Sequence, residues 1–263
     1  MPDLLPAAIK ERIDTADDTP GGTRETVLMA VGIPILVLVG FGLYAWWRQV
    51  ADLDSVETSA LAWGEVWLAI WQHIKLTVVA AVVVVVIALP LGIMLTRPGF
   101  KRAAPAVVAV ANGGQAAPSI GLIVLLAMWL GPGFWTSIYA LALYAILPVL
   151  RNTITGLQGV EPTLVEAGRG LGLSNFDVLR RIELPLALPV IMAGIRTALV
   201  LLVGTAALAT FINGGGLGGI ITAGINLYRY SVMVSGAVLV ALLALLIEWL
   251  GRVLELTTRP KGL

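Results

Sequence analysis

Cysteine is absent from this 263-residue sequence, and histidine occurs only once, at position 73. The lack of cysteine excludes disulfides, thiol catalysis and cysteine-ligated metals, and one histidine leaves no pair for a metal site or a proton relay. Residues 213–219 are glycine-rich, but they lack the lysine and the serine or threonine of a phosphate-binding loop. The sequence therefore predicts no catalytic residue, no metal site and no cofactor, and nothing in it suggests nucleic acid.

Charged residues are scarce: only 13% are Asp, Glu, Lys or Arg, whereas 58% are hydrophobic, and the mean hydropathy is +0.93. So few charges cannot cover a soluble surface of this size, so lipid must surround much of the chain. We expect an all-α polytopic membrane protein with about six transmembrane helices, because the apolar runs are long enough to cross a bilayer. The predicted spans are residues 27–47, 74–95, 104–130, 134–150, 188–211 and 232–256.

The segment before the second span has three predicted parts. Residues 1–26 form a cytoplasmic tail of mixed charge, residues 27–47 an extra first transmembrane helix, and residues 48–73 an external amphipathic loop. No signal-peptide pattern precedes the first apolar run, so we expect that run to remain as a helix. Tryptophans in the loop recur every four residues, which is typical of a stripe at headgroup level rather than of a ligand cage.

Residues 74–256 form the predicted membrane core, and residues 257–263 a cytoplasmic tail. The third span is interrupted by residues 112–119, which include Pro118. Irregular backbone inside a bilayer is tolerated only where protein or a cavity shelters it, so the break is expected to face a translocation path or a subunit interface. A proline kink in a packed helix is an equally good explanation. Arg196 lies within the fifth span and must pair inside the bundle or extend to the surface.

The polar insertion at residues 161–189 contains signals for two short helices. Pro162 suits a first helical turn, and Gly172 suits the left-handed position after a last turn. The second helix has a capping-box pair, an i,i+4 ion pair and a proline that is expected to end it. These residues are Ser174 with Asp177, Asp177 with Arg181, and Pro185. Small residues on the first helix would let a partner's backbone approach closely.

The same insertion resembles a motif of a known transporter family. Its positions here are Glu166, Ala167, Gly168, Gly172, Ile182, Leu184 and Pro185. Their order and spacing resemble the EAA loop of ABC importer permeases, except that Gly168 stands where the family pattern has a second alanine. The resemblance implies cytoplasmic coupling helices that dock in a cleft of the ATPase subunit. An ordinary helix-turn-helix connection is the alternative.

Two further stretches resemble permeases of the osmoprotectant type. Residues 115–119 resemble a Gln-x-x-Pro-Ser segment, and residues 207–218 resemble the glycine-rich end of a helix in glycine betaine and choline permeases, with Asn213 as a departure. The glycines would permit close helix contact or the movement of a gate, and a plain flexible turn is equally consistent with them. The candidate path or gate residues are Gln115, Pro118, Ser119, Asn213, Gly215 and Gly216.

The resemblance extends from about residue 74 to residue 255 and implies a larger assembly. Its expected parts are cytoplasmic ATPase subunits, an extracytoplasmic substrate-binding protein and a second permease copy or paralogue. The implied cargo is a compatible solute such as glycine betaine, choline or carnitine, and ATP is hydrolysed in the separate subunit. A permease for another small metabolite, such as an amino acid, remains open. A secondary transporter fits less well, because Glu248 is the only acid deep inside a late span, while Glu255 lies at the end of that span.

The distribution of basic residues predicts the orientation in the membrane. If the N-terminus is cytoplasmic, the outside loops contain only Arg48 and Arg229, as the positive-inside rule requires. The inside segments contain Arg97, Lys101, Arg102, Arg151, Arg169, Arg180, Arg181, Arg252, Arg259 and Lys261. We therefore expect a multi-pass protein of the inner (plasma) membrane with both termini in the cytoplasm.

Overall fold

The computed structural model describes residues 23–258 as a set of helices, without a strand in that range. Five of its helical segments are long and apolar enough to cross a membrane, and a sharply bent pair makes a sixth if it counts as one span. The five are Val31–Val50, Trp63–Thr96, Phe134–Gln158, Asn175–Ile212 and Tyr230–Glu255. The predicted all-α membrane architecture is confirmed. Most of both predicted tails, residues 1–22 and 259–263, lies outside the described residues.

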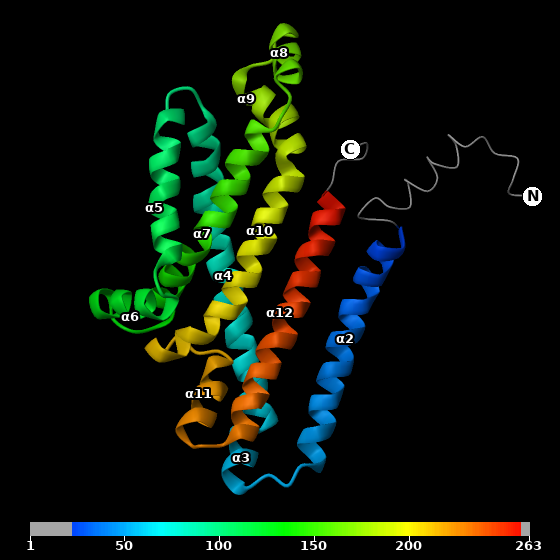
Figure 1. Ribbon diagram of the computed structural model, residues 1–263, viewed down its shortest axis with the longest axis vertical. Coiled ribbons are helices and arrows are strands. Elements are labelled where there is room, and N and C mark those ends of the chain that lie inside the picture. Colours follow the sequence, from blue (N-terminus) through cyan, green and yellow to red (C-terminus); the bar gives the residue numbers. More distant parts are fainter. Residues whose placement is uncertain (1–22, 259–263) are drawn as a thin grey trace, which may run out of the picture.

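Three long helices form the centre of the bundle (Figure 1): α4 (Trp63–Thr96), α7 (Phe134–Gln158) and α10 (Leu184–Ala206). α7 packs against both of the others. Small residues bring the backbones together where they cross, and a Cβ atom on Gly194 would lie only 2.8 Å from the carbonyl oxygen of Pro148. Such close approach stabilises helix pairs in lipid, where no hydrophobic effect drives them together.

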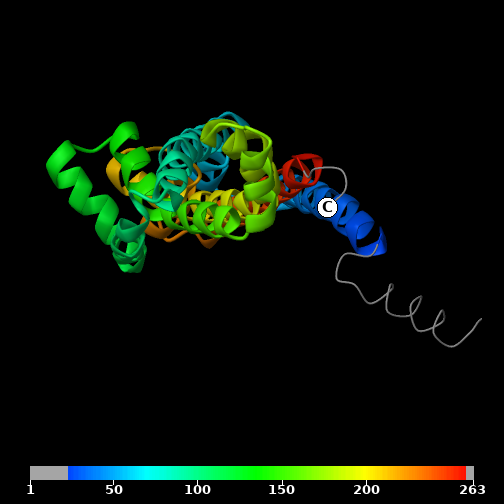
Figure 2. The same cartoon turned by 90° about the horizontal axis from the view of Figure 1, so that it is seen from above.

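The other helices extend this centre into a row, which Figure 2 shows from above. α12 (Tyr230–Thr258) packs on α10 and on the short helix α11 (Gly218–Asn226), and α2 (Thr23–Val50) packs on the outer side of α12. An aromatic contact also joins α2 to α4, with the rings of Phe41 and Trp63 6.1 Å apart. α2 is therefore a peripheral helix at one edge of the bundle.

The start of α4 differs from the prediction. The helix begins at Trp63, whereas the sequence predicted a start at residue 74 and an external loop over residues 48–73. The tryptophan stripe therefore lies on the first turns of a membrane helix, because no proline separates it from the apolar run. The rest of the connection contains the short helix α3 (Ser55–Ala60), which Asp54 caps.

The predicted third span is not one continuous helix. A single 3₁₀ turn, η1 (Lys101–Ala103), leads into the helix α5 (Ala104–Ala116). The helix α6 (Ser119–Leu130) follows, and the chain bends by 98° between α5 and α6. The break occurs at the predicted place, beside Pro118. Its direction has a tertiary cause, since Ile123 of α6 is buried against residues of α7 and η3.

Pro185 does not end the second helix of the polar insertion, contrary to the prediction. α9 (Asn175–Val178) continues through one π-helical turn, η2 (Leu179–Glu183), directly into α10, and Pro185 lies in the first turn of α10. Because the helix is continuous here, the missing N–H of Pro185 removes one helical hydrogen bond, and the wider π-helical turn just before it accommodates the proline. α10 then continues into a 3₁₀ segment, η3 (Ala207–Ile212).

Candidate functional site

α8 and α9 form a two-helix loop at one end of the molecule (Figure 1). α8 (Pro162–Gly170) begins with the predicted proline, and Gly172 follows it with φ 82°. The backbone N–H of Asp177 donates to the Ser174 hydroxyl over 3.1 Å, and the Asp177 carboxylate pairs with Arg181 at 3.6 Å. The local signals for the end of the first helix and the start of the second are thus confirmed.

The motif residues of α8 differ in burial. Glu166 and Ala167 are exposed, whereas Gly168 is buried against Ile182. A Cβ atom on Gly168 would lie 2.5 Å from Cδ1 of Ile182, so this glycine lets α8 approach η2 closely. Gly168, which stands where the family pattern has a second alanine, therefore lies at the contact between the two halves of the loop.

An ion pair joins this loop to the end of α4. The two terminal nitrogens of Arg97 donate to the two carboxylate oxygens of Glu183, over 2.5 and 3.3 Å. Glu183 is buried, and the motif residues Leu184 and Pro185 that follow it are half-buried. A buried carboxylate needs such a partner. The sequence indicated Arg97 only as a cytoplasmic cation, and no pattern in it pointed to Glu183.

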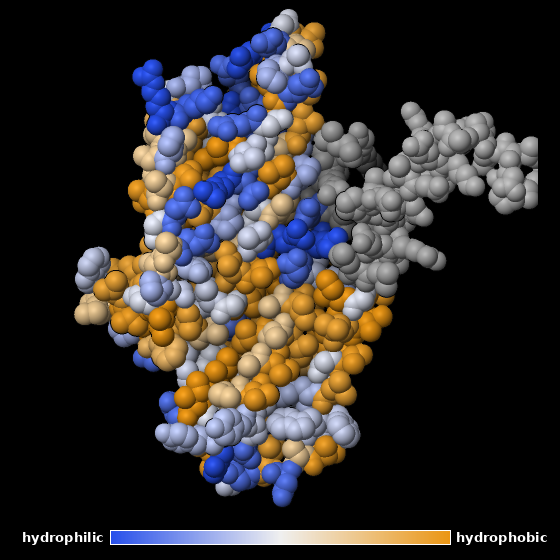
Figure 3. Space-filling model, in the orientation of Figure 1, coloured by the Kyte–Doolittle hydropathy of each residue, from blue (hydrophilic) through white to orange (hydrophobic). Residues whose placement is uncertain are grey.

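Apolar side chains project from the same loop. Leu171 is 84% exposed and Phe176 is 68% exposed, and Leu164 is also exposed. In Figure 3 hydrophilic side chains gather at this end of the molecule, while apolar ones gather across its middle. Exposed apolar residues among polar ones are typical of a protein interaction site. The sequence motif did not single out these three residues.

The glycine loop, residues 213–217, connects η3 to α11. Its backbone is left-handed at Asn213, Gly215 and Gly216, with φ of 59°, 83° and 94°. This conformation suits glycine and, less often, asparagine, which explains the residue types at these three predicted positions. The long helical run that starts at α9 ends here.

Two side chains of α4 hold the glycine loop. The N–H of Gly216 donates to Oε1 of Gln72 over 3.0 Å, and the N–H of Leu217 donates to Nδ1 of His73 over 3.2 Å. The other ring nitrogen of His73 donates to the carbonyl oxygen of Val203 on α10, over 2.9 Å. Gln72 and His73 were missed because the sequence placed them in an external loop, although a polar pair next to an apolar run was the available signal.

A groove of about 430 Å³ lies beside the glycine loop. Its walls come from α3, the first half of α4, the loop itself and α11. Gln72, Gly215 and Gly216 line it, whereas the neighbouring His73 and Leu217 are fully buried. The contact between α4 and the glycine loop therefore closes the floor of the groove.

The other predicted path residues lie at the break between α5 and α6. Gln115 and Ser119 are half-buried there, and Pro118 is exposed. α6 contacts η3, which leads into the glycine loop, and Ile123 and Ile212 pack between them. The two predicted path segments are thus neighbours through the apolar contacts of α6.

Comparison with known proteins identifies the family. The model of the family described as binding-protein-dependent transport system inner membrane component matches residues 88–260. The chain belongs to this family. A glycine betaine/carnitine/choline transport system permease protein of Bacillus subtilis is 42% identical over 200 residues, which cover 76% of this chain and 91% of that protein. A choline transport system permease protein of the same organism has the same identity and coverage.

A solved structure of the MetNI methionine ABC transporter in an inward-facing conformation has the same fold. The TM-score is 0.64 at 28% identity, and the match covers 74% of this permease and 97% of that chain. Together the comparisons show a multi-pass permease subunit of an ABC importer in the inner membrane.

The arginine inside the fifth span of the permease pairs inside the bundle, which was one of the two predicted possibilities. Arg196 lies 3.3 Å from a carboxylate oxygen of Glu248 and 3.4 Å from one of Glu255. Both glutamates are on α12, so this cluster joins α10 to α12. An arginine in lipid requires such pairing inside the bundle.

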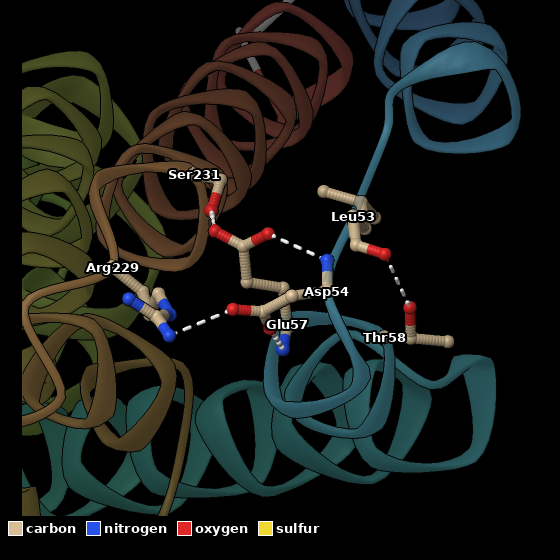
Figure 4. Close-up of polar contacts among 6 residues, drawn as sticks. All are labelled: Leu53, Asp54, Glu57, Thr58, Arg229 and Ser231. Atoms are coloured by element: carbon tan, nitrogen blue, oxygen red, sulfur yellow. Dashed lines mark hydrogen bonds and ion pairs between the residues drawn. The ribbon is translucent and has the colours of Figure 1, made fainter.

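A second polar cluster ties the permease together at its α3 end (Figure 4). Asp54 pairs with Arg229 over 2.8 Å, and the hydroxyl of Ser231 donates to the carboxylate of Glu57. The same carboxylate accepts the N–H of Asp54 over 3.0 Å. These contacts join the connection before α4 to the turn between α11 and α12.

Proposed function

We propose that this permease carries a small quaternary amine such as glycine betaine, choline or carnitine into the cell. The observation that carries the proposal is the 42% identity, over 76% of the chain, to permeases named for these solutes. ATP hydrolysis belongs to cytoplasmic partner subunits, and a second permease copy or paralogue completes the membrane pathway.

The α8–α9 loop is the proposed docking element for the ATPase. Glu166, Ala167 and the exposed apolar side chains face the partner, while Gly168 and Ile182 keep the two halves of the loop in contact. Gly172 sets the turn between them, and Leu184 and Pro185 begin α10, so movement of the loop reaches the membrane core directly. In this proposal both termini, with residues 1–26 and 257–263, lie on the cytoplasmic side.

The proposed pathway runs past the break between α5 and α6 and past the glycine loop. Its candidate residues are Gln115, Pro118, Ser119, Asn213, Gly215 and Gly216. An extracytoplasmic binding protein delivers the solute and supplies most of the selectivity. Aromatic faces in such a protein bind quaternary ammonium by cation–π attraction, worth about 0.5 to 2 kcal/mol per contact.

The test is uptake of radiolabelled glycine betaine and choline into vesicles that contain the permease and its ATPase, with and without the binding protein. We expect uptake only with ATP and the binding protein. Exchange of the binding protein should change the solute without any change in this chain. Rapid ATP-dependent uptake of methionine, with no response to quaternary amines, would instead favour the transporter type of the structural relative.

A further inference from the structure

The glycine loop depends on α4 for hydrogen bonds that its own backbone cannot make. The loop interrupts the helical run, so its N–H groups need partners, and in lipid an unsatisfied N–H is costly. Gln72 and His73 accept from two consecutive N–H groups, those of Gly216 and Leu217. His73 uses both ring nitrogens and thereby connects α4, α10 and the glycine loop through one side chain.

This contact lies on a thin seam of the bundle. α4 packs mainly on α7, and α11 packs mainly on α12, whereas α4 and α11 touch each other at few points. Movement of the glycine loop away from α4 would therefore leave both well-packed pairs intact. It would separate Leu217 from Val66 and Ala69 of α4, with which it shares a buried apolar cluster. The seam also forms the floor of the groove, where half-buried Gln72 lies beside fully buried His73 and Leu217.

We propose that Gln72 and His73 form a latch that holds the glycine loop closed against α4 and releases it in every transport cycle. An importer must open its pathway alternately to the two sides, and such changes occur where two packed units meet. The proposal rests on the transport function of the chain and is independent of which solute it carries.

The decisive experiment fixes the latch with a disulfide. A Cβ atom on Gly215 would lie 3.7 Å from Cβ of Gln72, which is within the range of about 3.5–4.5 Å found in disulfides. The chain has no cysteine, so Gln72→Cys combined with Gly215→Cys creates the only possible pair within it. We expect oxidation of this variant, in the complete complex, to abolish ATP-dependent uptake, and reduction to restore it.

The comparison of oxidised with reduced protein removes the effect of strain at Gly215, since its φ of 83° disfavours any side chain in both forms. The single variants Gln72→Cys and Gly215→Cys are the matched controls and should not respond to the oxidant. A cross-linked protein that transports as fast as its reduced form would overturn the proposal. A pair that does not cross-link would contradict the closed contact itself.

A second measurement reports the latch without any solute. Thr77 lies one turn after His73 on α4 and is fully buried, so Thr77→Cys should react slowly with a membrane-impermeant thiol reagent. Adding His73→Phe should raise the labelling rate severalfold, and adding His73→Asn, which keeps an acceptor for Leu217, should raise it less. Equal rates in all three would contradict a latch, whereas absence of quaternary amine uptake would contradict only the proposed solute.

Discussion

Gly172 holds the turn between α8 and α9 in the left-handed region, with φ 82°. A Cβ atom there would meet no neighbour within 4 Å, so conformation rather than space requires glycine. A residue with a side chain pays about 1–2 kcal/mol in this region. Substitution should therefore change the angle between α8 and α9 while the membrane helices stay in place.

We expect Gly172→Val to weaken capture of the ATPase about tenfold, the factor that corresponds to about 1.4 kcal/mol. Gly172→Asn is the matched control and should lose less, because asparagine tolerates the left-handed conformation. The measurement is a pull-down of the ATPase, with uptake assayed at equal membrane abundance. Normal uptake by the valine variant would show that the turn does not control docking.

The conformations that depend on neighbours in the sequence were predictable, whereas the contacts with distant residues were not. The positive φ of Gly172 and the cap at Ser174 depend on neighbours in the sequence, and both were predicted. Gln72 and His73 contact residues 144 positions away, and no sequence pattern specified those partners. Arg196 is intermediate, because lipid made a partner necessary without identifying it.

At the scale of elements, the α8–α9 loop is polar but presents Leu171 and Phe176 to the outside. Burial of such a side chain at an interface contributes roughly 1.5–3 kcal/mol. The short helix α9, which starts at a cap and continues into a membrane helix, holds Phe176 in a fixed position. The loop is therefore suited to transmit force as well as to bind.

We expect Phe176→Ser to weaken association with the ATPase by roughly 10- to 100-fold, since buried aromatic anchors dominate interfaces. Phe100→Ser is the matched control. Phe100 is also an exposed phenylalanine, at 52%, but lies in the connection between α4 and α5. Binding of the purified ATPase to detergent-solubilised permease measures both. Equal losses in the two variants would indicate a general effect of surface hydrophobicity.

The kinds and approximate positions of the elements followed from hydropathy and from the caps, whereas their directions did not. The break near Pro118 was predicted, but the turn of 98° depends on the burial of Ile123 against other helices. The start of α4 at Trp63 was missed because its first turns are amphipathic and resemble a surface segment. Pro185 was misinterpreted because the π-helical turn before it has no clear sequence signal.

At the scale of the whole molecule, polar clusters occupy both ends and an apolar belt lies between them (Figure 3). Arg97 and Glu183 tie α4 to α10 at the α8 end, and Asp54 and Arg229 tie the helix connections together at the α3 end. Transport requires the two ends to open in turn. If the glycine loop, near the α3 end, acts as the proposed gate, this gate faces the proposed binding protein.

That assignment depends on the orientation of the chain, which basic residues predict: they concentrate at the α8 end, so this end should face the cytoplasm. Because the chain has no cysteine, Ser55→Cys on α3 and Thr163→Cys on α8 each introduce one exposed thiol. In intact cells a membrane-impermeant maleimide should label only the cysteine at position 55, and after permeabilisation it should label both. The unsubstituted permease is the unlabelled control. Labelling of position 163 from outside would reverse the topology and place the glycine loop at the cytoplasmic gate.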